Sequence, residues 1–437
     1  MVFFPIPKRS SCLLKWHLLK WNRMNPAVTG ERNRAMIIKP YIKDFEEMGF
    51  GVFVHFGIYS VLGKGEWAKC CLKIPNDTYE ALAKSFCPKE GWAKELAAAA
   101  KSAGAKYITL TTRHHDGFSL YDTQGLTEFD APHCCGRDLI REFTDACREY
   151  GIRPFFYHTL VDWHNPDYQS DFPAYLSYLR SGVKLLCTNY GEIGGIWFDG
   201  TWDKPQADWE EDALYRLIRT YQPEAMIINN TGMDARGALG HIELDSVTFE
   251  QGKPHAINLE DSPKYIASEM NRTMNDHWGY AAADVNYKSV GQLIAELAEC
   301  RRYGANYLLN VGPRGDGILR LIDRGILETI GQWVSVNAEA IRKPRPTQTS
   351  VEAHPNDFLL RSQEGLYLFV MPEPVQPDGS SDRLERFPLP DRIQSVRWLD
   401  NGQPLPYRQE NGIAEITALP FDYGTSLVVR IAKITLE

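Results

Sequence analysis

The 437-residue sequence lacks any apolar run long enough to cross a bilayer, which requires about 20 consecutive apolar residues. The only apolar stretch near the start is interrupted by Lys15, His17 and Lys20. A secretory signal needs an uninterrupted apolar core of about 7–15 residues, so this stretch is a poor candidate for one. We therefore expect neither a membrane span nor a membrane partner.

An excess of positive charge and a regular cysteine pattern are also missing. The formal net charge is −8, and no long basic run follows residue 25, which argues against a nucleic-acid partner. The nine cysteines are an odd number, include the adjacent pairs Cys70-Cys71 and Cys134-Cys135, and form no Cys-x-x-Cys repeat. Neither a disulfide framework nor a zinc site is expected, and a reduced, cytoplasmic protein is the simplest interpretation. The oligomeric state is not fixed, and a homo-oligomer is compatible with the sequence.

Short apolar runs alternate with helical patterns from residue 50 to about residue 341. The pattern predicts eight strands, at 51–56, 107–112, 153–158, 195–199, 225–230, 246–250, 265–269 and 306–311. Eight strands with interleaved helices over this length favour a (β/α)8 TIM-like barrel. A doubly wound sheet is the alternative, but no Gly-x-Gly-x-x-Gly loop follows an early strand. Helices are unclear around the sixth and seventh strands, where we expect irregularity.

The remainder of the chain divides into three further regions. Residues 1–25 form an N-terminal extension of unknown role, ahead of the barrel domain at 26–341. Residues 342–357 contain Pro344, Pro346 and Pro355 and are predicted to be a linker. Residues 358–437 carry short β-rich runs and Asn-Gly turn signals, which predict a small antiparallel β-sandwich.

Polar residues follow several of the predicted strands. Asp199 ends an apolar strand, and Trp197 and Phe198 beside it are suited to walling a sugar-sized pocket. Since the carboxyl ends of barrel strands form the face that carries active sites, we expect these residues to converge. The set comprises His55, Glu66, Trp67, His114, His115, Tyr157, His158, Asp199, Glu250, Glu269 and Trp278.

Three kinds of site compete for this set. Two carboxylates at suitable separation hydrolyse glycosides, whereas His and Asp at strand ends also bind catalytic metals. The metal interpretation is weakened because adjacent His114 and His115 would point to opposite sides of a strand. A sugar-binding protein without turnover is the third alternative.

The sequence resembles the α-L-fucosidases of glycoside hydrolase family 29. The resemblance rests on Gly65-Glu-Trp67, Arg113-His-His-Asp-Gly-Phe118, Asp162-Trp-His-Asn-Pro-Asp-Tyr168, Trp197-Phe-Asp-Gly200, Trp278-Gly-Tyr280, and the regions 50–60 and 306–313. It covers the whole predicted barrel, and it departs at Phe56, where Trp is commoner in the family.

The resemblance implies an exo-acting, retaining α-L-fucosidase that acts on fucosylated oligosaccharides or glycoconjugates and needs no metal or organic cofactor. Asp199 would be the nucleophile. The fucose pocket would be lined by His55, Glu66, Trp67, His114, His115 and Tyr157, with Trp278 as an apolar wall. Alternatives are the same chemistry on a related sugar such as galactose, and a fucose-binding protein.

The motif resemblance does not identify the acid/base residue. Glu250 resembles the family's acidic residue after a short strand and is our first choice, ahead of Glu269 and then Glu243. A retaining pair should lie about 5–5.5 Å apart, and the acid needs a raised pKa. These two requirements can be examined in the structure.

Overall fold

The computed structural model describes residues 38–259, 262, 264–352, 354–372 and 382–437. The described residues all belong to one compact unit, Ile38–Glu437. The predicted N-terminal extension at 1–25 therefore lies outside the described residues.

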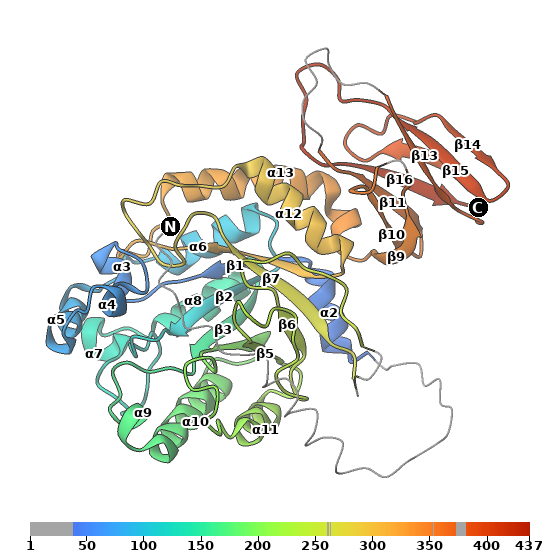
Figure 1. Ribbon diagram of the computed structural model, residues 1–437. Coiled ribbons are helices and arrows are strands. Elements are labelled where there is room, and N and C mark those ends of the chain that lie inside the picture. The colour runs from blue at the N-terminus through green and yellow to red at the C-terminus, as the bar shows by residue number, and fades with distance from the viewer. Residues whose placement is uncertain (1–37, 260–261, 263, 353, 373–381) are drawn as a thin grey trace, which may run out of the picture. The chain divides into compact units, whose positions relative to one another are not determined.

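Eight parallel strands close into a barrel in sequence order, which confirms the predicted fold class (Figure 1). The strands are β1 (Phe50–Val54), β2 (Tyr107–Arg113), β3 (Arg153–Thr159), β4 (Gly195–Asp199), β5 (Met226–Asn230), β6 (Ser246–Thr248), β7 (Ala267–Thr273) and β8 (Asn306–Val311). β1 pairs with both β2 and β8, so the sheet has no free edge.

Helices follow most strands and form the outer layer of the barrel. The longer ones are α2 (Pro40–Met48), α6 (Trp92–Ser102), α8 (Leu139–Tyr150), α10 (Phe172–Asn189), α11 (Glu211–Tyr221), α12 (Val290–Arg302) and α13 (Leu321–Ile341). Short elements lie in the loops: α3 (Tyr59–Leu62), α4 (Ala68–Cys71), α5 (Asn76–Glu80), η1 (Ala81–Ser85), α7 (Ala131–Cys135) and α9 (Asp167–Ser170). None of the helices within the described ranges has the length and apolar content of a membrane span.

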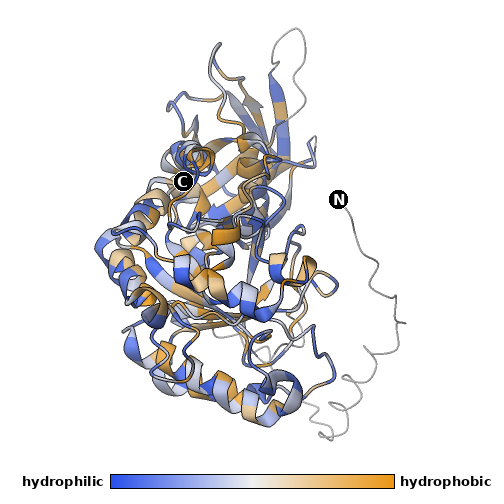
Figure 2. Cartoon of the chain, turned by 90° about the vertical axis from the view of Figure 1, so that its left-hand side faces the viewer, coloured by the Kyte–Doolittle hydropathy of each residue, from blue (hydrophilic) through white to orange (hydrophobic). Residues whose placement is uncertain are grey.

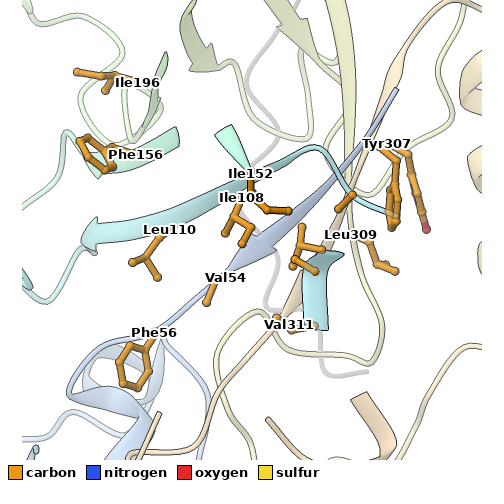
Figure 3. Packing of buried hydrophobic residues seen from close by; sticks show 14 of the residues in the cluster. Val54, Phe56, Ile108, Leu110, Ile152, Phe156, Ile196, Tyr307, Leu309 and Val311 are labelled. Carbon is orange, nitrogen blue, oxygen red and sulfur yellow. The ribbon is translucent and has the colours of Figure 1, made fainter. Parts of the chain in front are cut away.

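The barrel strands read as continuous apolar runs because both of their faces are buried. Outward-facing side chains such as Val54, Ile108 and Leu110 belong to the large cluster between the strands and the helices (Figure 3). Inward-facing side chains, among them Phe53 and Trp197, form a separate cluster. The outer helices carry both hydrophilic and hydrophobic residues, as expected for elements with one buried face (Figure 2).

Helix α2 packs against the end of the barrel where the strands begin. Its Ile42 and Phe45 are buried in the same cluster as the inward-facing strand residues. The Tyr41 hydroxyl also donates a hydrogen bond to Asp245, just before β6, at 3.2 Å. Functional side chains must therefore be sought at the other end, where the strands finish.

Two strand boundaries near the expected irregularity differ from the sequence-based prediction. β6 ends at Thr248 instead of Glu250, and β7 begins at Ala267 and runs to Thr273 instead of ending at Glu269. The prediction stopped β7 at its first charged residue, but that residue is buried and hydrogen-bonded inside the barrel. No helix occurs between β5 and β7 among the residues described there.

The C-terminal residues form two antiparallel sheets that share a second hydrophobic cluster. One has the order β13-β16-β11-β10-β9 and the other β12-β15-β14. Their strands are β9 (Arg345–Ser350), β10 (Phe358–Ser362), β11 (Gly365–Val370), β12 (Arg383–Pro388), β13 (Ile393–Trp398), β14 (Tyr407–Glu410), β15 (Ile413–Ala418) and β16 (Arg430–Leu436). The range 342–357, expected to be a linker, thus contains β9, which pairs with β10. Its prolines did not prevent this because β9 is an edge strand.

Candidate active site

Asp199 lies at the last position of β4, and both of its carboxylate oxygens are contacted by neighbouring side chains. Oδ2 accepts a hydrogen bond from the Tyr157 hydroxyl at 3.1 Å and lies 3.5 Å from His115 Nε2. Oδ1 accepts from Trp202 Nε1 at 3.0 Å and from Asn230 Nδ2 at 3.1 Å. The carboxylate is therefore held in a fixed orientation at the rim of the barrel.

These contacts decide the ionisation of Asp199. Burial alone would raise the pKa of this carboxyl, but the hydrogen bonds from His115, Trp202 and Asn230 favour the charged form and outweigh it. The pKa of Asp199 is consequently held below its ordinary value. Near neutral pH the residue is a carboxylate, which is the form that a nucleophile requires.

A second carboxyl, that of Glu250, is joined to Asp199 through the amide of Asn230. Asn230 Nδ2 donates to Glu250 Oε2 at 2.7 Å and to Asp199 Oδ1 at 3.1 Å, so these two oxygens are at most about 5.8 Å apart, the two bonds laid end to end. Retaining glycosidases hold their carboxyl groups about 5–5.5 Å apart, and inverting enzymes about 6.5–9.5 Å. The arrangement matches the retaining class.

Glu250 has the opposite ionisation from Asp199. Burial and the nearby negative charge of Asp199 raise the pKa of Glu250 to about 7. The hydrogen bond from Asn230 and the positive charge of Arg236 oppose this rise without cancelling it. Two neighbouring carboxyl groups with pKa values pushed apart are the pattern of a nucleophile and a general acid.

The other acid/base candidates lie elsewhere. Glu269 is fully buried inside the barrel, where Oε2 accepts from the Tyr107 hydroxyl at 2.5 Å and Oε1 from Trp197 Nε1 at 3.0 Å. Burial raises the pKa of Glu269 to about 7 as well. However, its partner Tyr107 is the first residue of β2, so the Glu269 carboxyl lies towards the end of the barrel where the strands begin and not at the rim. Glu243 precedes β6 by three residues and therefore lies near the end at which the strands begin.

His55 follows β1 and is fixed by an amide from β8. Its Nδ1 lies 2.7 Å from Asn310 Oδ1, while Asn310 Nδ2 donates to the Trp278 carbonyl at 2.7 Å. Because the Asn310 oxygen can only accept, Nδ1 carries the proton and Nε2 is left as an acceptor. Burial lowers the pKa of His55 to about 3, so the ring is neutral. The indole of Trp278 lies against it, with ring centroids 5.1 Å apart.

His114 and His115 lie beside one another, contrary to the expectation that they point to opposite sides. β2 ends at Arg113, so strand alternation no longer applies, and the two ring centroids are 4.2 Å apart. His115 Nδ1 contacts Thr159 Oγ1 at 2.7 Å, which directs Nε2 towards Asp199. The His114 ring stacks on Tyr157 with centroids 5.7 Å apart, and burial lowers its pKa well below the ordinary value.

The remaining predicted residues divide between the rim and the interior. Glu66 is buried and its Oε2 accepts from the Gly279 amide at 2.7 Å, while burial raises its pKa. Trp67 packs edge-on against His115, with centroids 5.5 Å apart. Trp197, by contrast, is an interior residue that stacks beneath Tyr157 and donates to Glu269. Trp197 therefore lies inside the barrel, below the rim that carries Asp199.

Three residues at the site were not singled out from the sequence: Asn230, Trp202 and Asn310. Asn230 and Asn310 could have been recognised from the sequence, because each is a polar residue at or next to the end of a predicted apolar strand. Asn230 is in register with Asp199 on the neighbouring strand. Trp202 lies in a loop, whose course the apolar pattern does not reveal.

Asp199 itself is not a free metal ligand, because both of its oxygens accept hydrogen bonds from protein donors. Among the described residues, one group has the spacing of a metal site: His354, Asp357 and Glu385 in the C-terminal sheets. Arg383 contacts both of its carboxylates, at 2.6 and 3.3 Å, so a cation there would compete with a guanidinium.

Comparisons with known proteins identify the family of this chain. The sequence profile of the family Alpha-L-fucosidase matches residues 27–339. The tissue alpha-L-fucosidase of Macaca fascicularis is 28% identical over 355 residues, which are 72% of this chain and 71% of that protein. Alpha-L-fucosidase isoenzyme 1 from Paenibacillus thiaminolyticus has 30% identity and a TM-score of 0.79, covering 91% of this chain and 99% of that structure. Thermotoga maritima alpha-fucosidase in complex with fucose has 25% identity and a TM-score of 0.72, covering 90% and 96%. The chain therefore belongs to the α-L-fucosidase family.

Proposed function

We propose that Asp199 and Glu250 are the nucleophile and the acid/base of a retaining exo-α-L-fucosidase. The observation that carries the proposal is the shared Asn230 amide, which brings two carboxyl groups of opposite ionisation within about 5.8 Å. Family membership supports the substrate class, and the Thermotoga relative was solved with fucose bound.

In the first step, the Asp199 carboxylate attacks the anomeric carbon of an α-L-fucoside and the bond to the leaving oxygen breaks. Glu250 gives its proton to that oxygen, so the aglycone departs as a neutral alcohol. In the second step, ionised Glu250 takes a proton from water, whose oxygen attacks the anomeric carbon. The fucosyl–Asp199 bond breaks in this step. Because Asp199 attacks from the β face in the first step and water from the α face in the second, the product has the original configuration.

The surrounding side chains supply hydrogen bonds in defined directions. Neutral His55 offers Nε2 as an acceptor for a sugar hydroxyl, and Trp278 adds an apolar wall next to it. Burial and the charge of Asp199 raise the pKa of Tyr157 well above its ordinary value, so its hydroxyl remains a donor to the nucleophile. Glu66, Trp67, His114 and His115 complete the proposed fucose pocket.

Hydrolysis of 4-nitrophenyl α-L-fucoside by the wild type, Asp199→Ala and Glu250→Ala, with and without azide, tests the two roles. Asp199→Ala should lose turnover and regain it with azide, giving the β-fucosyl azide because azide enters from the vacated face. Glu250→Ala should yield the α-fucosyl azide from the covalent intermediate. Glu269→Gln serves as the matched carboxyl control and should yield no fucosyl azide. An α-azide product from Glu269→Gln and none from Glu250→Ala would move the acid/base role to Glu269.

The same assay addresses the two alternative functions. A fucose-binding protein would leave the fucoside intact while binding fucose. It would also have no need for two carboxyl groups with separated pKa values. L-Fucose and D-galactose share the relevant hydroxyl arrangement, so weak hydrolysis of 4-nitrophenyl β-D-galactoside is expected alongside the main activity. If the protein hydrolysed the galactoside faster than the fucoside, it would be a galactosidase in the first place and the fucosidase assignment would fall.

Two proposals concern the setting of the protein. The net charge of −8 supports the absence of a nucleic-acid partner. Eight described cysteines are free, and exposed Cys70, Cys71 and Cys87 are among them, which supports a reducing, cytoplasmic compartment. Oxidised glutathione should therefore add to these exposed thiols, as read by intact mass. Self-association stays a prediction, for which sedimentation velocity is the test.

A further inference from the structure

Trp202 combines a contact to the nucleophile with an unusually open indole. Its Nε1 donates to Asp199 Oδ1 at 3.0 Å, yet 38% of the residue surface is exposed. The ring lies tilted against Trp67, with centroids 5.9 Å apart, and edge-on to His115, with centroids 5.5 Å apart. The indole is thus held in one position at the rim of the fucose pocket while much of its surface faces solvent.

The loop after β5 meets this indole beside Asn230, which joins the two carboxyl groups. The Gly232 amide donates to Asn230 Oδ1 at 3.3 Å, and Asn230 is the residue that contacts Glu250 Oε2. A Cβ on Gly232 would lie 3.7 Å from Trp202 Cδ1, so the two loops are adjacent. The next residue, Met233, is 53% exposed. Trp202 and the loop that carries Met233 therefore lie beside Asn230, whose amide joins the nucleophile to the proposed acid.

The charged neighbours of Trp202 are engaged elsewhere. Asp203 accepts a hydrogen bond from the Tyr168 hydroxyl at 2.5 Å. Lys204 donates to Gln169 Oε1 at 3.3 Å, and its ammonium lies 4.5 Å from the centre of the Tyr168 ring. Since both charges are directed towards α9, the surface that Trp202 offers is aromatic and uncharged.

We propose that Trp202 and Met233 form the aglycone subsite, and that it accepts a neutral pyranose ring laid on the indole face. The inference rests on the proposed function, in which Glu250 protonates the oxygen that joins fucose to the next sugar. The ring attached to that oxygen must lie close to Glu250, and Trp202 and the loop that carries Met233 are the exposed segments that adjoin the Asn230 link to Glu250. Aromatic faces match the apolar faces of sugar rings, and a neutral sugar suits an uncharged platform.

Two substrates separate aglycone binding from an effect on the nucleophile. One is an α-L-fucosyl disaccharide with neutral galactose as the aglycone, and the other is α-L-fucosyl fluoride, whose leaving group has no ring. Trp202→Ala should lower kcat/KM for the disaccharide about tenfold more than for the fluoride, the effect of one lost stacking contact. Trp202→Phe removes the Nε1 donor but keeps an aromatic face, so the ratio between the two substrates should stay close to that of the wild type.

A second variant and a control keep the test decisive. Met233→Ser should also reduce the disaccharide rate selectively, and it covers the case in which Trp202→Ala fails to fold. Tyr221→Ala is the matched control, because Tyr221 is a similarly exposed aromatic residue (42%) at the end of α11 and should change neither rate. If Trp202→Ala left the ratio of kcat/KM between the disaccharide and the fluoride unchanged, the proposed subsite would be overturned. A wild type that cleaves neither substrate would instead refute the proposed function.

Discussion

The contact that joins the two carboxyl groups can be removed by a single substitution, Asn230→Ala. Asn230 donates to the charged forms of both Glu250 and Asp199, and Thr248 Oγ1 orients its amide by donating to Oδ1 at 2.9 Å. In the wild type, kcat/KM requires Glu250 protonated and Asp199 ionised, so it should fall as pH rises through about 7. Losing the donor destabilises the Glu250 carboxylate, so the pKa of Glu250 must rise.

The size of this shift follows from the strength of the lost bond. A hydrogen bond to a charged group contributes about 1.5–3 kcal/mol, and one pKa unit corresponds to about 1.4 kcal/mol. Water entering the space left by the amide would replace part of the donation. We therefore expect the alkaline limb of the pH profile to move upward by about one unit, with a lower rate at its maximum because the carboxyl groups are less well held.

The measurement is kcat/KM against pH for phenyl α-L-fucoside, a substrate whose poor leaving group needs the acid. Thr248→Val should shift the limb in the same direction by a smaller amount. Asn229→Ala is the matched control, because this neighbouring amide donates to the Tyr215 hydroxyl and not to the carboxyl pair. It should leave the limb near pH 7. An Asn230→Ala profile with an unmoved or lowered alkaline limb would refute the assignment of Glu250 as the acid.

Three other outcomes are expected. Glu269→Ala should lower the free energy of unfolding by about 2–6 kcal/mol, because the buried donors of Tyr107 and Trp197 each lose an acceptor, at a cost of about 1–3 kcal/mol per donor. Urea denaturation measures this free energy, and a loss below about 1 kcal/mol would contradict the prediction. Tyr157→Phe should reduce kcat/KM about tenfold without loss of folding, because it removes one donor from Asp199 Oδ2, and an unchanged rate would show that this bond is not used. Prolonged dialysis against EDTA should leave fucosidase activity unchanged, since both oxygens of Asp199 already accept hydrogen bonds from protein donors, and a loss restored by a divalent cation would refute this.

The barrel could be predicted from the sequence because its strands are buried on both faces and appear as apolar runs between glycine-closed helices. The end of β4 at Asp199 was predicted correctly, since the apolar run stops there at a carboxylate. The same rule failed for β7, where Glu269 interrupts the run without ending the strand. A carboxyl group that accepts two hydrogen bonds from protein donors, as Glu269 does, can lie in the interior of a strand. The local sequence does not distinguish it from a carboxyl group at the rim, such as that of Asp199.

Contacts made through loops account for what could not be predicted. Trp202 reaches Asp199 through the turn at Gly200, whose φ of 123° and a Cβ position 2.7 Å from Val161 Cγ2 require glycine. The proximity of His114 and His115 depends on β2 ending at Arg113, because strand alternation would apply to both only if the strand continued through His115. The prolines of the range 342–357 predicted a linker, but an edge strand tolerates proline. Whether such a strand forms depends on its pairing with β10, which the local sequence does not reveal.

The most direct test of the central claim is to identify the residue that bonds covalently to the sugar. Incubation with 2-fluoro-fucosyl fluoride should arrest the reaction at the covalent stage, and peptide mass spectrometry should then find one fluorofucosyl group on the peptide that contains Asp199. The label should be absent from Asp199→Asn and present in Glu269→Gln. A label on Glu66, Glu250 or Glu269 would contradict the assignment of Asp199. Turnover with inversion of configuration and no label would contradict the retaining mechanism itself.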